Sequence, residues 1–371
     1  MKSSNTSSGS STTCITAAAI AVLAQLFASL YLSSSNAYAS SVKGPKPPAA
    51  IVFGDSVVDP GNNNYLPTVA KCNFPPYGRD FEGGKPTGRY SNGKVPSDFI
   101  VEEFGIKELL PPYLDPTLQL NDLLTGVNFA SGASGYDPLS AQTANALSLT
   151  DQLRLFKEYK EKLKAGIGKD RASNIISESL YAIFIGSNDL TNTYYSTLLR
   201  RPYYSISAYT DLMIAYALRF FQELYDLGAR KIGVTNLPPI GCLPSQRTLA
   251  GGPLRSCVEE YNRAAALFNS KLYSEIKSLN SQLPGSKITY LDIYNPLLSL
   301  INNPSQSGFE VVNKGCCGTG TIEVSLLCNR YQPTTCTDDT KYIFWDSYHP
   351  TEKTYRIIVN QLFNESSGSF F

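Results

Sequence analysis

The sequence predicts an α/β fold in which one parallel sheet is covered by helices. From residue 49 onwards, short runs rich in β-branched residues end in Gly, Asn or Ser and alternate with longer segments of helical period. No internal repeat and no linker divides this stretch. We therefore expect one domain at 49–371 with long loops between its elements.

Each element of this fold is predicted by its own pattern. The expected strands are 49–54, 126–130, 180–186, 231–235 and 287–293. Helical spacing of four and three residues is shown by Met213, Ala217, Phe220, Leu224 and Leu227, a run that stops at Gly228. The same spacing recurs over 258–272, and further helices are expected over 150–163 and after His349.

The N-terminus is typical of a secretory signal peptide over residues 1–39. A Ser/Thr-rich lead with Lys2 precedes an apolar run at about 14–32, and the small-x-small pattern Ala37-Tyr38-Ala39 follows it. Two alternatives stay open, because the long apolar run also suits a retained anchor and the Ser-rich, acid-free start also suits organelle import. The Pro-rich segment 40–48 is expected to be a spacer before the domain.

The near-zero net charge gives no indication of a nucleic-acid or anionic membrane partner. The formal net charge of 371 residues is +1, so there is no electrostatic bias toward nucleic acid or an anionic membrane surface. After the leader no segment offers about 18 unbroken apolar residues, so no membrane span is expected. Nothing in the sequence indicates the oligomeric state.

Cysteine usage favours an oxidising compartment. Removal of Cys14 with the leader leaves an odd number, so one thiol should stay free. A zinc site is disfavoured, because the chain has no Cys-x-x-Cys pair and its single histidine lies outside the cluster. We expect structural disulfides among Cys316, Cys317, Cys328 and Cys336, and a local one between Cys242 and Cys257. Outside the leader, the glycosylation sequon is Asn364-Glu365-Ser366.

A candidate nucleophile follows the first expected strand. The stretch "FGDSVVDPGNNN" places Ser56 at a strand's carboxyl end, where open parallel sheets carry their functional residues. A Gly-Asp-Ser triplet by itself is weak evidence, since Asp55 or Ser56 could equally cap a helix.

The single histidine strengthens this hypothesis. An acyl-transfer serine needs a base, and His349 in "FWDSYHP" is the only imidazole of the chain. Asp346 precedes it by three residues, a spacing that places both side chains on one face of a turn. The carboxylate can then accept the proton of the imidazole nitrogen that faces away from Ser56.

Donors for an oxyanion are expected at two further strand ends. In "GVNFASGASG" the backbone N–H of Gly132 can approach a ligand closely, and in "IFIGSND" Asn188 offers a side-chain amide. Turn formation and helix capping are the alternative reasons for a glycine and an asparagine there.

Taken together, the blocks "FGDSVVDPGNNN", "GVNFASGASG", "IFIGSND" and "DSYHP" resemble, in order and spacing, the signatures of the plant GDSL-type esterase/lipases of the SGNH hydrolase superfamily. The resemblance extends over nearly all of the chain after the leader. It implies a three-layer α/β/α fold with a mainly parallel, five-stranded, flavodoxin-like sheet. It also implies a secreted carboxylic ester hydrolase that needs no cofactor or metal.

The resemblance also implies a role for each candidate residue. Ser56 would be the nucleophile, His349 the general base and Asp346 the residue that orients it. The oxyanion hole would consist of the Ser56 and Gly132 backbone N–H groups and the Asn188 side chain. Two positions depart from the family: Val57 stands where Leu is usual, with its side chain expected to point into the fold, and Gly-Ala-Ser-Gly replaces Gly-Gly-Ala-Gly from Gly132 onwards.

The substrate and the acceptor are left open. No Gly-x-Ser-x-Gly elbow and no dinucleotide or phosphate loop is present, which disfavours an ordinary α/β-hydrolase and a nucleotide enzyme. Fatty acyl esters, cutin-type monomers and acylated wall polysaccharides all fit, and Tyr194, Tyr195, Tyr203 and Tyr204 are either a substrate wall or ordinary packing. The alternatives to a hydrolase are a secreted acyltransferase with the same site and a non-catalytic extracellular binding or coat protein.

Overall fold

The centre of the molecule is a parallel sheet whose strands are buried on both faces. The computed structural model describes residues 1, 2, 4 and 46–365, so nearly all of the predicted leader and most of the spacer lie outside the described residues. The sheet has the order β1-β2-β3-β4, with all neighbouring strands parallel. Its strands are β1 (Ala50–Gly54), β2 (Leu180–Phe184), β3 (Lys231–Thr235) and β4 (Lys287–Leu291). Each lies inside or on a predicted strand.

The predicted fifth strand, 126–130, runs beside β1 but does not form a regular ladder. Val52 and Asn128 make an isolated parallel bridge, in which Val52 N donates to Val127 O at 3.3 Å and Phe129 N donates to Val52 O at 2.8 Å. At the next rung Ser131 N still donates to Gly54 O at 3.1 Å, but the Gly54 N–H donates to the Gln152 side chain at 3.0 Å instead of to the neighbouring segment. The prediction of five regular strands is therefore wrong at this edge, although the segment takes the expected place.

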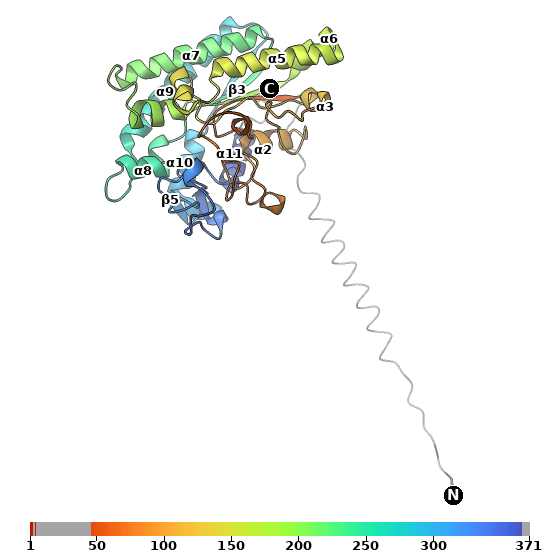
Figure 1. Ribbon diagram of the computed structural model, residues 1–371, viewed down its shortest axis with the longest axis vertical. Coiled ribbons are helices and arrows are strands. Elements are labelled where there is room, and N and C mark those ends of the chain that lie inside the picture. The colour runs from red at the N-terminus through yellow and green to blue at the C-terminus, as the bar shows by residue number, and fades with distance from the viewer. Residues whose placement is uncertain (3, 5–45, 366–371) are drawn as a thin grey trace. The chain divides into compact units, whose positions relative to one another are not determined.

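Successive side chains of a strand point to opposite faces of the sheet, so their core contacts show which helices cover each face. Ile51 and Phe53 of β1 belong to the larger core cluster with the residues of α5, α7 and α9. Ala50 and Val52 belong to a second cluster with residues of α2 and α11. Figure 1 shows α5, α6, α7 and α9 above the sheet and α2 and α11 below it, which is the predicted three-layer arrangement.

The long helices lie where the sequence repeats apolar residues at helical spacing over many positions. Ser148 caps α5, since its hydroxyl accepts from Asp151 N, and the Asp151 carboxylate accepts from Ser148 N. The helices are α2 (Pro96–Glu103), α3 (Leu120–Leu124), α4 (Pro138–Ala144), α5 (Leu149–Ile167), α6 (Lys169–Glu178), α7 (Ile206–Asp226), α8 (Pro244–Ala250), α9 (Glu259–Gln282), α10 (Tyr294–Asn302) and α11 (Glu352–Glu365). The expected helices over 150–163, around 213–227, over 258–272 and after His349 correspond to α5, α7, α9 and α11.

Short elements complete the chain. A two-stranded parallel sheet, not predicted from the sequence, joins β5 (Val311–Gly315) to β6 (Tyr342–Phe344), and β6 leads directly into the segment that carries His349. The short helical turns are η1 (Asn62–Tyr65), η2 (Glu82–Gly84), η4 (Ile240–Cys242), η5 (Pro304–Ser307), η6 (Ser325–Leu327) and η7 (Asp339–Lys341), and η3 (Asp189–Ser196) is a π-helix.

The cysteine prediction is confirmed. Disulfides join Cys242 to Cys257, Cys316 to Cys336 and Cys317 to Cys328. Among the described residues, the free thiol is the buried Cys72. The predicted unpaired cysteine is therefore Cys72.

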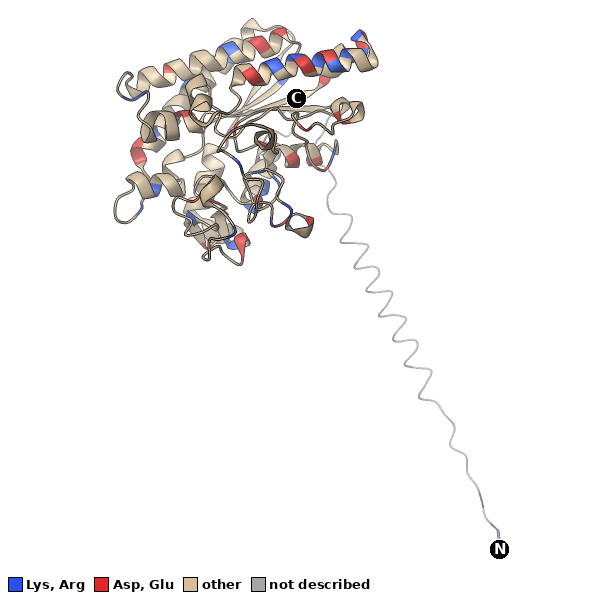
Figure 2. Cartoon of the chain, in the orientation of Figure 1, with Lys and Arg blue, Asp and Glu red and all other residues tan. Residues whose placement is uncertain are grey.

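Charge is distributed over the helices in both signs. Lys and Arg alternate with Asp and Glu along α5 and α6 in Figure 2, which agrees with the near-neutral composition. Within the part of the chain that the structure describes, no helix is both long enough and apolar enough to cross a membrane.

Candidate active site

Ser56 and Asn188 lie at one edge of the sheet because the strands before them are parallel neighbours. Ser56 follows β1 and Asn188 follows β2. His349 reaches the same place from the segment after β6. These three residues, together with Val57 and Tyr348, line one pocket.

The central feature is a hydrogen-bonded series of three side chains. His349 Nε2 lies 2.7 Å from Ser56 Oγ, although the two residues are 293 positions apart in the sequence. His349 Nδ1 lies 2.8 Å from Asp346 Oδ2 and 2.9 Å from Oδ1. Ser56 and His349 keep 8% and 5% exposure, whereas Asp346 is fully buried. The imidazole can therefore exchange a proton with the serine while the carboxylate stabilises its charged form.

The turn around Asp346 is held by its own backbone. Asp346 Oδ1 accepts hydrogen bonds from Tyr348 N at 2.8 Å and His349 N at 2.7 Å. Trp345 N donates to His349 O at 2.7 Å and closes the turn. The three-residue spacing thus places the carboxylate under the imidazole, as expected.

Asn188 presents an amide that is already oriented. Its Nδ2 donates to Ser134 O at 2.9 Å, and its Oδ1 accepts from Asn192 Nδ2 at 2.9 Å. Asn192 lies in η3, and single turns of π-helix are frequent at functional sites. The other Nδ2 hydrogen has no partner within residues 46–365, so it is available to a ligand in the pocket.

The loop after β1 also leaves a donor available. Asp55 N donates to Phe184 O at 2.9 Å, and Val57 N donates to Asp55 Oδ1 at 3.0 Å. Between them, the N–H of Ser56 has no hydrogen-bond partner among the residues that the structure describes. A backbone donor and the Asn188 amide therefore flank the serine hydroxyl.

Gly132, the third expected donor, already has a hydrogen-bond partner. Its N–H donates to the buried Asp59 Oδ2 at 2.9 Å, and Gly132 is not among the residues that line the pocket in the described part of the chain. A Cβ at this position would lie 2.3 Å from the Tyr90 hydroxyl oxygen, so close packing alone requires a glycine. Tyr90 in turn packs on His349 with ring centroids 4.9 Å apart. No spacing in the sequence relates Tyr90 to the histidine, so this contact was not predicted.

The departure from the family pattern at the next position has a conformational cost. Ala133 has φ 74°, in the left-handed region that favours glycine. The left-handed conformation costs an alanine about 1–2 kcal/mol. This chain therefore keeps a strained residue directly after Gly132, at the position where the signature it resembles would place a second glycine.

Three buried carboxyl groups surround this edge of the sheet. Burial raises the pKa of Asp55 to about 7, that of Asp59 to about 6 and that of Asp189 to about 7, against an ordinary value of 3.8. Backbone N–H groups oppose this effect, for example Gly61 N at 2.8 Å from Asp59 and Asp137 N at 2.8 Å from Asp189, but desolvation is the larger influence.

These shifts predict that the protein is more stable in mild acid. Between about pH 4 and pH 7 the folded chain holds protons on Asp55, Asp59 and Asp189 that the unfolded chain has released, so the free energy of unfolding falls as the pH rises. We expect a higher Tm at about pH 5 than at about pH 7.5, measured by circular dichroism. Asp55→Asn should reduce this difference, because an amide does not titrate. A Tm that rises over this range would contradict the prediction.

The pocket beside Ser56 is apolar. It encloses about 680 Å³ of space, a value that includes open solvent at its mouth. Its walls are mainly aliphatic and come from several elements: Pro96, Pro238, Leu243, Ile293, Leu297, Ile358 and Val359. A non-polar group attached to a carbonyl at Ser56 would find a matching surface there.

The structure decides between the two interpretations of the tyrosines and shows where Val57 lies. Tyr194 and Tyr195 are buried in the larger core cluster and Tyr203 is 80% exposed, so these tyrosines pack or face solvent and do not form a substrate wall. Val57, expected to point into the fold, is half-buried: it packs against the second core cluster and also lines the pocket next to Ser56. The aliphatic lining comes from loops and helices that the sequence pattern does not bring together.

A serine hydrogen-bonded to a histidine that is held by an aspartate, at the carboxyl edge of a parallel sheet, defines the serine class of hydrolases. Comparison with known families narrows this class. Residues 51–362 match the family model described as GDSL-like Lipase/Acylhydrolase. The chain belongs to this GDSL esterase/lipase family and is a carboxylic ester hydrolase.

Relatives from Arabidopsis thaliana are similar over most of their length. The chain is 53% identical over 323 residues to GDSL esterase/lipase EXL3, with 87% of this chain and 88% of the relative covered. It is 49% identical over 345 residues to GDSL esterase/lipase EXL2, with 89% of this chain and 91% of the relative covered. The fold predicted by the resemblance, an α/β SGNH-type hydrolase, is therefore confirmed.

Proposed function

We propose that this chain is a secreted esterase that hydrolyses esters of aliphatic acids through an acyl-enzyme on Ser56. The observation that carries the proposal is the 2.7 Å contact between His349 Nε2 and Ser56 Oγ, with Asp346 on the opposite nitrogen. His349 removes the hydroxyl proton as Oγ attacks the ester carbonyl, and then passes it to the departing alcohol. Water, activated by the same imidazole, releases the acid in the second half of the cycle.

The negative charge of the tetrahedral oxygen needs preorganised donors. We assign this role to the Ser56 N–H and to the second Asn188 Nδ2 hydrogen, neither of which has a hydrogen-bond partner among the described residues. Gly132 is a third donor in this proposal, but its N–H is shared with Asp59 Oδ2. Its contribution should accordingly be the smallest of the three.

The pocket favours one substrate class among those that the sequence left open. Its aliphatic lining beside Ser56 offers contacts to an alkyl chain and few partners for the hydroxyl groups of a sugar. Each buried methylene contributes about 0.8 kcal/mol, so two additional methylenes should increase kcat/KM about tenfold. We therefore assign the acyl chain, rather than the alcohol, to this pocket.

A panel of p-nitrophenyl esters tests this assignment. We expect kcat/KM to rise about tenfold from acetyl to butyryl. Equal rates for both would contradict an acyl pocket.

Reaction of Ser56 with a fluorophosphonate probe tests the site itself. Labelling that disappears in Ser56→Ala supports an enzyme, and no labelling favours a binding protein. Product analysis with an added alcohol separates a hydrolase from an acyltransferase.

Secretion is part of the proposal. Three disulfides in the described domain are typical of an oxidising compartment, and the leader pattern at 1–39 agrees with that destination. Asn364 of the predicted glycosylation sequon is exposed at the end of α11, where a glycan would meet no packed surface. We propose 49–371 as the single hydrolase domain, and the described residues 46–365 fall in one unit by their contacts.

A further inference from the structure

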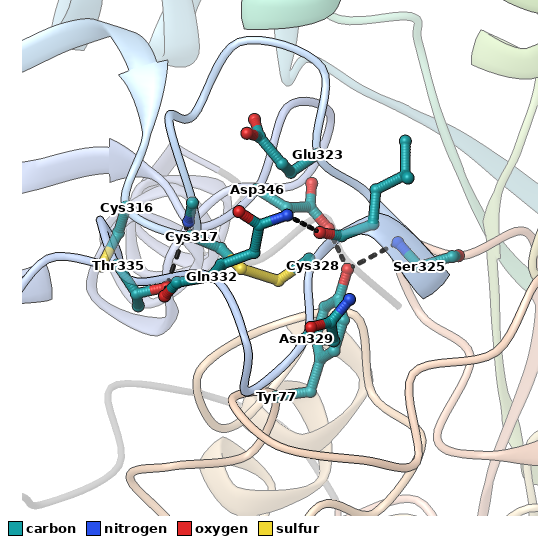
Figure 3. Close-up of a disulfide and its surroundings, with 12 residues drawn as sticks. Tyr77, Cys316, Cys317, Glu323, Ser325, Cys328, Asn329, Gln332, Thr335 and Asp346 are labelled. Atoms are coloured by element: carbon teal, nitrogen blue, oxygen red, sulfur yellow. Dashed lines mark hydrogen bonds between the residues drawn. A yellow bond between two sulfur atoms is a disulfide. The ribbon is translucent and has the colours of Figure 1, made fainter.

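A buried tyrosine connects Asp346 to a disulfide-closed loop. The Tyr77 hydroxyl donates to Asp346 Oδ2 at 2.8 Å and accepts from Ser325 N at 2.9 Å. Figure 3 shows the phenol oxygen between these two groups, with the Cys317–Cys328 disulfide beside it. Tyr77 is fully buried, and neither hydrogen bond can be replaced by solvent without opening the structure.

The direction of these hydrogen bonds is fixed by chemistry. A backbone N–H can only donate, so the Tyr77 oxygen accepts from Ser325 and turns its own hydrogen toward the carboxylate. Burial and the neighbouring charge of Asp346 raise the pKa of Tyr77 well above its usual value. The phenol therefore stays protonated and remains a donor to Asp346.

The contact falls on Oδ2, the nearer of the two carboxylate oxygens that the imidazole contacts. Asp346 Oδ1 is occupied by two backbone N–H groups, those of Tyr348 and His349. Asp346 Oδ2 accepts from Tyr77 and contacts His349 Nδ1 at 2.8 Å. Loss of the phenol hydroxyl would leave this oxygen with the imidazole as its single polar partner among the described residues, and the carboxylate plane would be held from one side only.

The loop from Cys317 to Cys328, here the disulfide loop, supports both flanks of the same aspartate. Cys317 N donates to Trp345 O at 2.8 Å, and Ser347 N donates to Glu323 O at 2.9 Å. The Glu323 carboxylate in turn accepts from Thr319 N at 2.9 Å, within the loop. The disulfide closes this loop across 11 positions. The loop thus contacts the residue before Asp346, the residue after it and the tyrosine that binds its side chain.

We propose that Tyr77 is a positioning residue, which holds Asp346 Oδ2 in line with His349, and that the disulfide loop in turn holds Tyr77 through Ser325 N. The inference deepens the proposed function and rests on it. Tyr77 touches no substrate in this account, since it is absent from the residues that line the pocket in the described part of the chain. Its effect should therefore appear in the chemical step and not in substrate binding.

Tyr77→Phe tests the role of the hydroxyl. A hydrogen bond to a charged group is among the stronger kinds, so we expect kcat to fall about 10- to 100-fold with KM within about twofold of the wild type. Tyr159→Phe is the matched control, because it removes another buried hydroxyl, bonded to Leu123 O at 2.7 Å, far from the site. It should leave kcat nearly unchanged. Equal kcat for the two variants would overturn the proposal.

A double variant separates positioning from general damage. If Tyr77 acts through Asp346, then Tyr77→Phe should cause no further loss of the residual activity of Asp346→Asn, measured as the rate of fluorophosphonate labelling. The same fold-loss in both backgrounds would show a role independent of Asp346 and overturn the proposal. Failure of the proposed function is recognised separately: Ser56→Ala would then retain activity, whatever Tyr77→Phe does.

The contribution of the loop is tested in the same way. Replacement of Cys317 and Cys328 by serine should lower kcat in the wild type but lower it less when Tyr77 is already Phe, because part of the effect passes through the phenol. Equal losses in both backgrounds would contradict the link through Ser325. If the loop variant does not fold, the cycle with Asp346→Asn still decides the role of Tyr77.

Discussion

Ser56→Ala is expected to lower kcat/KM toward a short p-nitrophenyl ester by about 10⁴- to 10⁶-fold, the largest loss of any single substitution in this chain. The hydroxyl is the atom that bonds to the acyl group, and methyl cannot replace it. Its 2.7 Å contact with His349 Nε2 is also the route by which the proton leaves. The remaining activity would come from the oxyanion donors and the pocket alone.

The matched control for this substitution is Ser347→Ala. Ser347 is fully buried beside Asp346, and its hydroxyl has no hydrogen-bond partner in the described structure, so the variant should keep nearly full activity. Because Ser56 and His349 act as one unit, Ser56→Ala combined with His349→Ala should be no slower than Ser56→Ala alone. A wild-type rate in purified Ser56→Ala would refute the acyl-enzyme mechanism. If the double variant lost as much activity as the two single losses combined, proton transfer between Ser56 and His349 would be refuted.

The central fold was predictable because its strands are buried on both faces. Runs such as 49–54 and 231–235 need apolar, β-branched residues at successive positions, and that requirement is visible in the sequence. β5 carries the exposed Asn313 and Lys314, so its pattern resembles that of a loop and the small second sheet was missed. The irregular pairing of 126–130 depends on Gln152, a distant side chain that no local pattern announces.

The candidate site was predictable to the extent that chemistry limited the choice. With one imidazole in the chain, any histidine-dependent site had to contain His349, and the aspartate three residues earlier followed from turn geometry. Gly132 shows the limit of this reasoning. A glycine that frees a backbone N–H and a glycine that makes room for a tyrosine ring look the same in a sequence, and the sequence does not reveal that Tyr90 packs against Gly132.

Asn188→Ala is expected to lower kcat about 10²- to 10³-fold with KM little changed. An oxyanion donor binds the tetrahedral oxygen more strongly than the ground-state carbonyl, so its loss raises the barrier by about 2.7–4 kcal/mol. Asn188 suits this role because Ser134 O and Asn192 Nδ2 hold its amide before substrate arrives. The measurement is steady-state hydrolysis of a butyryl ester.

The same hydrogen bonds provide a control that isolates the donor. Asn192→Ala removes the bond to Asn188 Oδ1 and the one that the Tyr348 hydroxyl donates to Asn192 Oδ1 at 3.0 Å, but it leaves the donating Asn188 amide, so it should cost far less activity. Asn188→Asp keeps an acceptor for Asn192 and replaces the donor with a negative charge facing the developing oxyanion, so it should be at least as slow as Asn188→Ala. If Asn192→Ala were as damaging as Asn188→Ala, the side chain would act by holding η3 in place. A loss confined to both Asn188 variants would instead place its amide on the reacting oxygen, next to the N–H of Ser56.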